Sequence, residues 1–99
     1  MVQIKWLEEA KQDLKEIYEY IASDSAKYAR YQVLQIKNRT QLLKVHPYAG
    51  KTVEEINDPE IKEIVVSHYR IIYRVVNKKL IHIMLVHHRA RDLTRRLRN

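Results

Sequence analysis

The sequence contains no cysteine and a single glycine among its 99 residues. Without cysteine, neither a disulfide nor a thiolate metal site can form, and one glycine is too few for a glycine-rich phosphate loop. No apolar run approaches the roughly 20 residues that span a bilayer, and the N-terminus lacks the order of a signal peptide. We therefore expect a cytoplasmic protein without a membrane partner, and we expect no cofactor.

Acidic side chains are scarce in the last third of the chain. Residues 64–99 hold nine Lys and Arg but only Asp92, a net charge of +8, whereas residues 1–63 hold ten basic and eleven acidic residues, a net charge of −1. The whole positive excess therefore lies in the C-terminal part. Such an uneven distribution favours a polyanionic or acidic partner over a merely solvated surface.

The first half of the chain predicts one short strand and two helices. Val2–Trp6 alternates apolar and polar residues, as a strand does, and we expect Trp6 to pack in the core. Apolar residues then recur at helical spacing from about Leu7 to Ala22 and again from about Ala26 to Val45. The break at residues 23–25 is so short that the two helices must lie antiparallel, with Asp24 or Ser25 capping the second. Tyr18, Tyr20, Tyr28 and Tyr31 are expected to pack at the edges of these helices rather than to stack on bases.

The second half predicts strands. After the turn at Pro47 and Gly50 and a polar loop over 51–63, three β-rich segments follow at Ile64–Val66, Tyr69–Val76 and Leu80–Val86. We predict one α+β domain over residues 1–99, in which the helical hairpin packs on one face of a mainly antiparallel sheet of three to four strands. Leu93 and Leu97 suggest a short C-terminal helix, with a frayed tail as the alternative.

Two arginines mark one face of the middle strand. Side chains alternate along a strand, so Arg70 and Arg74 share a face with Ile72 and Val76. If the loop after this strand has three residues, Arg74 faces His82, Arg70 faces Val86, and His88 joins the arginine face. If the loop has two residues, His87 takes that place instead. A zinc site from His82, His87 and His88 is not expected, because neighbouring strand residues point to opposite faces.

The order of these elements and several short segments resemble the RelE/ParE family of toxins from type II toxin–antitoxin pairs. The segments that carry the resemblance are Ala10, Asp13-Leu14 and Ile17, then Pro47 and Gly50, then Tyr69–Arg74, and finally Val86–Leu93. The resemblance covers essentially the whole chain. It implies a toxin held silent by a cognate antitoxin, as part of a homodimer or of a hetero-oligomer with that antitoxin.

The resemblance leaves two targets open. RelE-like members cut messenger RNA on the ribosome without a metal, and ParE-like members inhibit DNA gyrase with no known chemistry of their own. A ribonuclease would use Arg70, Arg74, His87 and His88 as its catalytic groups, since the chemistry needs a base, an acid and cations on the phosphate. The acidic segment 51–63 and the lack of a C-terminal tyrosine favour the ParE side, and a non-enzymatic function.

The remaining predictions concern binding. Contacts to the target or to the antitoxin are expected from Lys51, Arg70, Arg74, His88, Arg89 and Arg91. Arg70 and Arg74 have a structural alternative, as partners of helix carboxylates or of the antitoxin. A third possibility is a non-toxic basic binding domain of the same fold.

Overall fold

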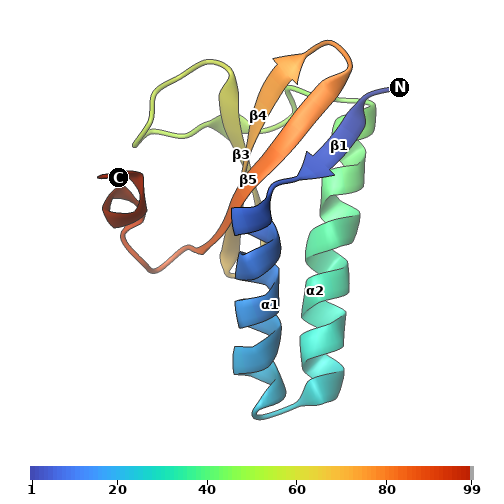
Figure 1. Cartoon of the computed structure of the whole chain (residues 1–99), viewed down its shortest axis with the longest axis vertical. Coiled ribbons are helices and arrows are strands. Elements are labelled where there is room, and N and C mark those ends of the chain that lie inside the picture. The colour runs from blue at the N-terminus through green and yellow to red at the C-terminus, as the bar shows by residue number, and fades with distance from the viewer. Residues whose placement is uncertain (99) are drawn as a thin grey trace.

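The computed structural model describes residues 1–98 (Figure 1). The elements follow one another in this order: β1 (Gln3–Trp6), α1 (Glu8–Ala22), α2 (Ala26–Thr40), the 3-10 helix η1 (Gln41–Lys44), β2 (Lys51–Thr52), β3 (Ile61–Val66), β4 (Tyr69–Asn77), β5 (Leu80–His88) and the 3-10 helix η2 (Leu93–Arg98). The predicted α+β class is confirmed. None of the described helices has the length and apolar character needed to cross a bilayer.

The two helices form the predicted antiparallel hairpin and extend side by side past one end of the sheet (Figure 1). Ser25 ends the short link, and its hydroxyl accepts the backbone N–H of Tyr28 at 3.1 Å, which caps α2. The second helical segment is shorter than predicted, because the α-helix ends at Thr40 and continues only as the 3-10 turn η1. The tighter turn brings Leu43 into the core, where it is fully buried.

The sheet has five strands in the order β1-β5-β4-β3-β2, one more than predicted. β1 pairs with β5 in parallel, and every other pair is antiparallel. The prediction of an unbroken polar loop over 51–63 was wrong at both ends, since Lys51–Thr52 forms β2 and β3 already begins at Ile61. A two-residue strand has no alternation from which it could be predicted.

Both faces of the sheet are covered, but by very different elements. The helix-facing core contains Ile71, Tyr73 and Ile83 against residues of α1 and α2. On the opposite face, a smaller core of Val53, Ile61, Ile72, Leu85 and Leu93 is closed by the 53–60 loop and η2. The C-terminal segment is therefore a docked 3-10 helix, whose first residue Leu93 is buried in this small core, and not a frayed tail.

Gly50 joins η1 to the sheet through an unusually close approach. Its N–H donates to the hydroxyl of Tyr73 at 3.0 Å. A Cβ at this position would lie 2.5 Å from the carbonyl oxygen of Glu63 and 2.8 Å from the Tyr73 hydroxyl. Only glycine lets the chain pass this close to β3 and β4.

Candidate functional site

The register of the β4–β5 hairpin decides which histidine shares a face with the arginines. Arg74 pairs with His82 and Arg70 pairs with His87. The three-residue alternative was therefore right that Arg74 faces His82, and the two-residue alternative was right that His87 lies on the arginine face. The loop has two residues, but irregularities near Val76 and near Met84 shift the register by one and then restore it. His87 lies on the arginine face as a result, and the expectation that Arg70 faces Val86 was wrong.

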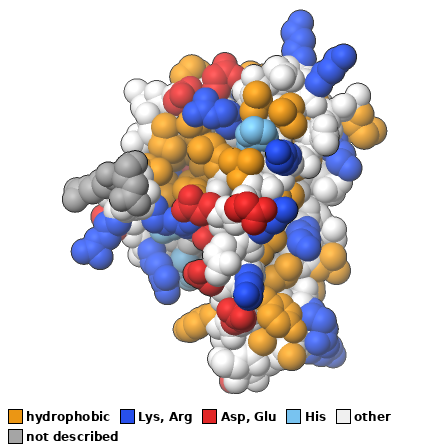
Figure 2. All heavy atoms as spheres, in the orientation of Figure 1, with side chains coloured by type: hydrophobic (Ala, Val, Ile, Leu, Met, Phe, Trp, Pro, Cys, Tyr) orange, Lys and Arg blue, Asp and Glu red, His pale blue; other side chains and the backbone are white. Residues whose placement is uncertain are grey.

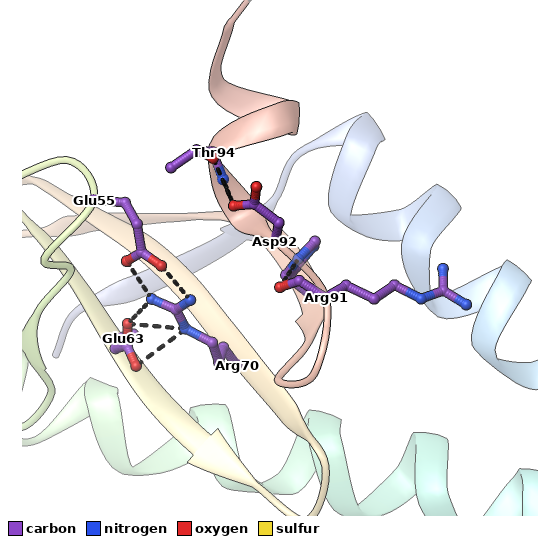
Figure 3. A network of polar contacts seen from close by, with 7 residues as sticks. Glu55, Glu63, Arg70, Arg91, Asp92 and Thr94 are labelled. Atoms are coloured by element: carbon purple, nitrogen blue, oxygen red, sulfur yellow. Dashed lines mark hydrogen bonds and ion pairs between the residues drawn. The ribbon is translucent and has the colours of Figure 1, made fainter.

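Arg70 is enclosed by two carboxylates (Figure 3). Its Nη1 and Nη2 donate to both oxygens of Glu55 at 2.8 Å, and its Nε and Nη2 donate to Glu63 at 3.1 and 2.5 Å. Hydrogen bonding to the guanidinium lowers the pKa of Glu55 from its ordinary 4.5 to about 2, and the same bonds raise the pKa of Arg70. The arginine is thus structural in the way foreseen as an alternative, although its partners come from β3 and a loop and not from a helix.

His87 is buried at 5% exposure, and both of its ring nitrogens are engaged. Nε2 donates to the carbonyl oxygen of Arg91 at 3.1 Å, and Nδ1 accepts from Arg96 Nη1 at 3.4 Å. Burial lowers the pKa of His87, and the neighbouring Arg96 and Arg70 lower it further. Because Nδ1 accepts from a guanidinium, it carries no proton in this arrangement, and the ring is enclosed by the protein.

Arg96 connects η2 to α1, which the sequence analysis did not predict. Its Nη2 donates to Glu9 at 2.9 Å and to both oxygens of Asp13 at 3.0 Å, and Asp13 also accepts the backbone N–H of Val86 at 2.8 Å. Burial raises the pKa of Asp13 despite these donors. One signal was available, because Asp13 lies between Ala10 and Ile17 on the apolar stripe of α1, where a carboxylate needs a partner.

The other predicted site residues are not gathered in one place. His88 stacks on His68 at 6.0 Å between ring centroids and meets Tyr69 edge-on at 5.4 Å. Arg89 and Arg91 follow β5 as exposed residues, and Figure 3 shows Arg91 pointing away from the Arg70 cluster. Lys51 lies on β2, at the opposite edge of the sheet from β1. Within residues 1–98, no group of three or more His, Asp or Glu side chains could hold a metal ion.

A groove of about 460 Å³ lies on the helical side of the molecule. Its lining is apolar at the centre and basic at the rim, and it consists of Trp6, Leu14, Tyr18, Val33, Lys11, Lys15 and Lys37. Trp6 is half-buried and packs against the helix-facing core, as expected, while also forming one wall of this groove. Among the helix tyrosines expected at the stripe edges, Tyr20 is 78% exposed, which contradicts packing there, whereas Tyr28 and Tyr31 are 50% and 56% exposed with their ring centroids 6.0 Å apart.

A helical hairpin thus backs a five-stranded sheet, and comparisons with known proteins show to which family this arrangement belongs. The family model described as "ParE toxin of type II toxin-antitoxin system, parDE" matches residues 4–93. The chain therefore belongs to the ParE toxin family, which confirms the resemblance noted in the sequence. A comparison with curated protein sequences finds no match.

A solved structure shows the same fold. It is described as the chromosomal ParDE toxin–antitoxin system from P. aeruginosa, and it is similar to this chain with a TM-score of 0.73. The two sequences are 24% identical, and the match covers 89% of this chain and 96% of the other. At that identity the likeness establishes the arrangement of the elements, and the roles of individual side chains have to be argued from their own contacts.

Proposed function

We propose that this toxin acts by binding DNA gyrase and inhibiting it, without cutting RNA. The observation that carries the proposal is the occupied state of Arg70 and His87. Arg70 and His87 are paired on neighbouring strands, and metal-free RNA cleavage by this pair would need the guanidinium free to hold the phosphate and the imidazole free to move the proton. Arg70 instead donates to Glu55 and Glu63, and the ring of His87 is buried with both nitrogens engaged. A toxin that works by binding needs neither group to be free.

The test is to compare the two target processes with one protein sample. Purified toxin is added to gyrase with relaxed plasmid, and separately to translating ribosomes with a labelled messenger RNA. We expect loss of supercoiling and an intact messenger. Cut messenger together with unimpaired supercoiling would establish the alternative, a RelE-like endonuclease.

We further propose that the cognate antitoxin silences the toxin by laying an amphipathic helix into the lysine-rimmed groove. The apolar centre at Trp6, Leu14 and Val33 suits the apolar stripe of such a helix. Lys11, Lys15 and Lys37 favour acidic side chains along its flanks. An acidic segment is also expected over the basic residues of 64–99, so association should accelerate as salt is lowered.

A matched pair of variants tests the groove. Lys15→Glu combined with Lys37→Glu reverses two charges at its rim, whereas Lys27→Glu combined with Arg30→Glu reverses two exposed charges on α2 that do not line it. We expect the rim variant to bind the antitoxin at least about tenfold more weakly, which corresponds to about 1.4 kcal/mol. Equal losses in both variants would reject the groove as the docking site, and loss of toxicity in the rim variant would assign those lysines to the target instead.

A further inference from the structure

A row of three basic side chains crosses the face of the sheet that lies opposite the helices. Lys5 on β1 pairs with His82 on β5, and His82 pairs with Arg74 on β4. Directly paired residues project from the same face, so all three point away from the helices. Figure 2 shows basic side chains and a histidine together on the upper part of the molecule. We call Lys5, His82 and Arg74 the cationic row.

The cationic row has no partner among the described residues. Within residues 1–98, neither a hydrogen bond nor an ion pair joins the side chains of Lys5, His82 or Arg74 to another group. The two other partly buried arginines differ, because Arg70 and Arg96 each bind two carboxylates. The residue paired with Arg74 on β3 is Ile61, which offers no charge.

The acidic residue next to Ile61 does not reach the cationic row. Glu60 precedes Ile61, and its carboxylate accepts a hydrogen bond from the Tyr48 hydroxyl at 3.3 Å. The ammonium of Lys62, which follows Ile61, lies over the same Tyr48 ring. Lys62 pairs with Tyr73, which belongs to the helix-facing core. Glu60 and Lys62 therefore both contact Tyr48 on the helical side of the sheet. Neither neutralises the cationic row, which can bind an anionic partner.

We propose that the cationic row binds the phosphodiester backbone of duplex DNA. Neighbouring strands lie about 4.8 Å apart, so the row spans roughly 10 Å. Duplex DNA carries one negative charge per about 1.7 Å of its axis when both strands are counted, so about 10 Å of duplex carries enough phosphates for a row of three basic side chains. Exposed Lys78 and Lys79 in the β4–β5 turn extend the basic surface at the same end of the sheet.

The composition of this face selects duplex over single-stranded nucleic acid. Proteins that hold single strands combine basic grooves with aromatic side chains on which bases stack. Among the described strands, every Tyr and Trp lies on the helical side: Trp6 pairs with Ile83, and Tyr69 and Tyr73 belong to the helix-facing core. Contacts to the backbone alone are independent of base sequence. The proposal does not depend on which target the toxin inhibits.

The test measures binding of the purified toxin to a labelled mixed-sequence DNA duplex by fluorescence anisotropy, without gyrase or antitoxin. We expect binding at about 50 mM salt that weakens steeply toward about 200 mM. Arg74→Gln and Lys5→Gln should each weaken binding about three- to tenfold and lower the slope of log affinity against log salt by about one. Arg30→Gln and Lys27→Gln remove the same charges from exposed positions on α2 and should change binding less than about twofold. Lys5 is exposed, so its variant remains informative if Arg74→Gln folds poorly.

Four outcomes would overturn the proposal. The duplex could fail to bind at low salt, or the α2 controls could weaken binding as much as the row variants, which would reduce the effect to net charge. Tighter binding of a single-stranded RNA of the same length would reassign the surface to a different nucleic acid. Displacement of the duplex by an equal charge concentration of poly-glutamate would assign the row to the acidic antitoxin segment that is expected over residues 64–99. The gyrase assay is separate, so failure here and failure of the proposed target are distinguishable.

Discussion

Arg70 and Arg74 lie on the same strand and the same face, four residues apart, yet they occupy opposite environments. Arg70 donates to two carboxylates beneath the 53–60 loop, and Arg74 has no partner in the part of the chain that the structure describes. The difference comes from their neighbours. Glu63 lies diagonally across from Arg70 on β3, while Ile61 lies opposite Arg74. The same residue type therefore closes a core at one end of the sheet and leaves a charged surface at the other.

The comparison separates stability from binding. At the Arg70 end, Glu55 fixes the loop, Arg96 fixes η2, and Leu93 fills the small core between them. At the Arg74 end, the row is left open and adds nothing to the core. We expect substitutions at the first end to act on folding and substitutions at the second to act on partners.

The largest effect expected is the loss of Arg70. Arg70→Met keeps the apolar stem but leaves Glu63, only 5% exposed, without its partner. Stranding a buried charge costs roughly 3–5 kcal/mol. Arg74→Met strands no carboxylate and should change the free energy of unfolding by less than about 1 kcal/mol. Urea unfolding of both variants measures the difference, and equal losses would remove the basis of the comparison.

A second large effect is expected at Gly50, which lies against Glu63 from the other side. Gly50→Ala places a methyl group 2.5 Å from the Glu63 carbonyl oxygen, and backbone atoms there must move. Overpacking of this kind costs about 1–3 kcal/mol. Ala49→Gly, one position away and exposed, serves as the control for a change in chain flexibility. A Gly50→Ala protein as stable as wild type would mean that the contact relaxes freely.

As the pH falls, the cluster of His87, Arg96 and Asp13 should weaken before the cluster of Arg70, Glu55 and Glu63. Burial lowers the pKa of His87 below its ordinary 6.5, so its contribution is present above pH 6.5 and is lost as the pH falls through the lowered value. The pKa of Glu55 falls from 4.5 to about 2, so its contribution is present above pH 4.5 and disappears only as the pH approaches 2. Asp13 acts in the opposite direction, because burial raises its pKa. Hydrogen exchange of η2 should therefore accelerate before the Arg70 cluster opens.

His87→Gln provides the control for this pH dependence. In this variant, exchange of η2 should no longer accelerate as the pH falls below 6.5, since glutamine does not titrate. The Arg70 cluster should still open as the pH approaches 2. Simultaneous release of η2 and of the 53–60 loop at one pH would show that the two clusters open as a single unit.

The sequence predicted the helices and strands in which apolar side chains recur at a regular spacing. Helix spacing predicted α1 within one residue at its start, and alternation predicted that Arg70, Ile72 and Arg74 share one face of β4. The parts without a period were missed, namely the two-residue β2 and the irregularities near Val76 and Met84. These irregularities decided the partner of Arg74, which is His82 and not Ile83. They cancel before Arg70, so its pairing with His87 follows from the two-residue loop.

The long-range partners could not be predicted either. Arg70 meets Glu55 across 15 positions, and Arg96 meets Asp13 across 83. The sequence shows only that an arginine on an apolar strand face and an aspartate on an apolar helix stripe each need compensation. Which charge supplies it depends on loops whose paths carry no pattern. The sequence therefore could not show which of the basic residues in the C-terminal segment binds Asp13.

The smallest effect expected concerns the backbone that positions the Arg70 cluster. Ser67 in the β3–β4 turn and Asn57 in the loop that carries Glu55 both have φ of 55°. A left-handed conformation costs most L-residues roughly 1–2 kcal/mol, and asparagine less. Glycine removes that cost but loses more entropy on folding, so Ser67→Gly should raise the free energy of unfolding by about 0.5 kcal/mol and Asn57→Gly by less. Both values come from urea midpoints compared with wild type. If Ser67→Gly destabilised the protein instead, the turn would be held by contacts of the serine side chain and not by its backbone, and Arg70 would owe its register to those contacts.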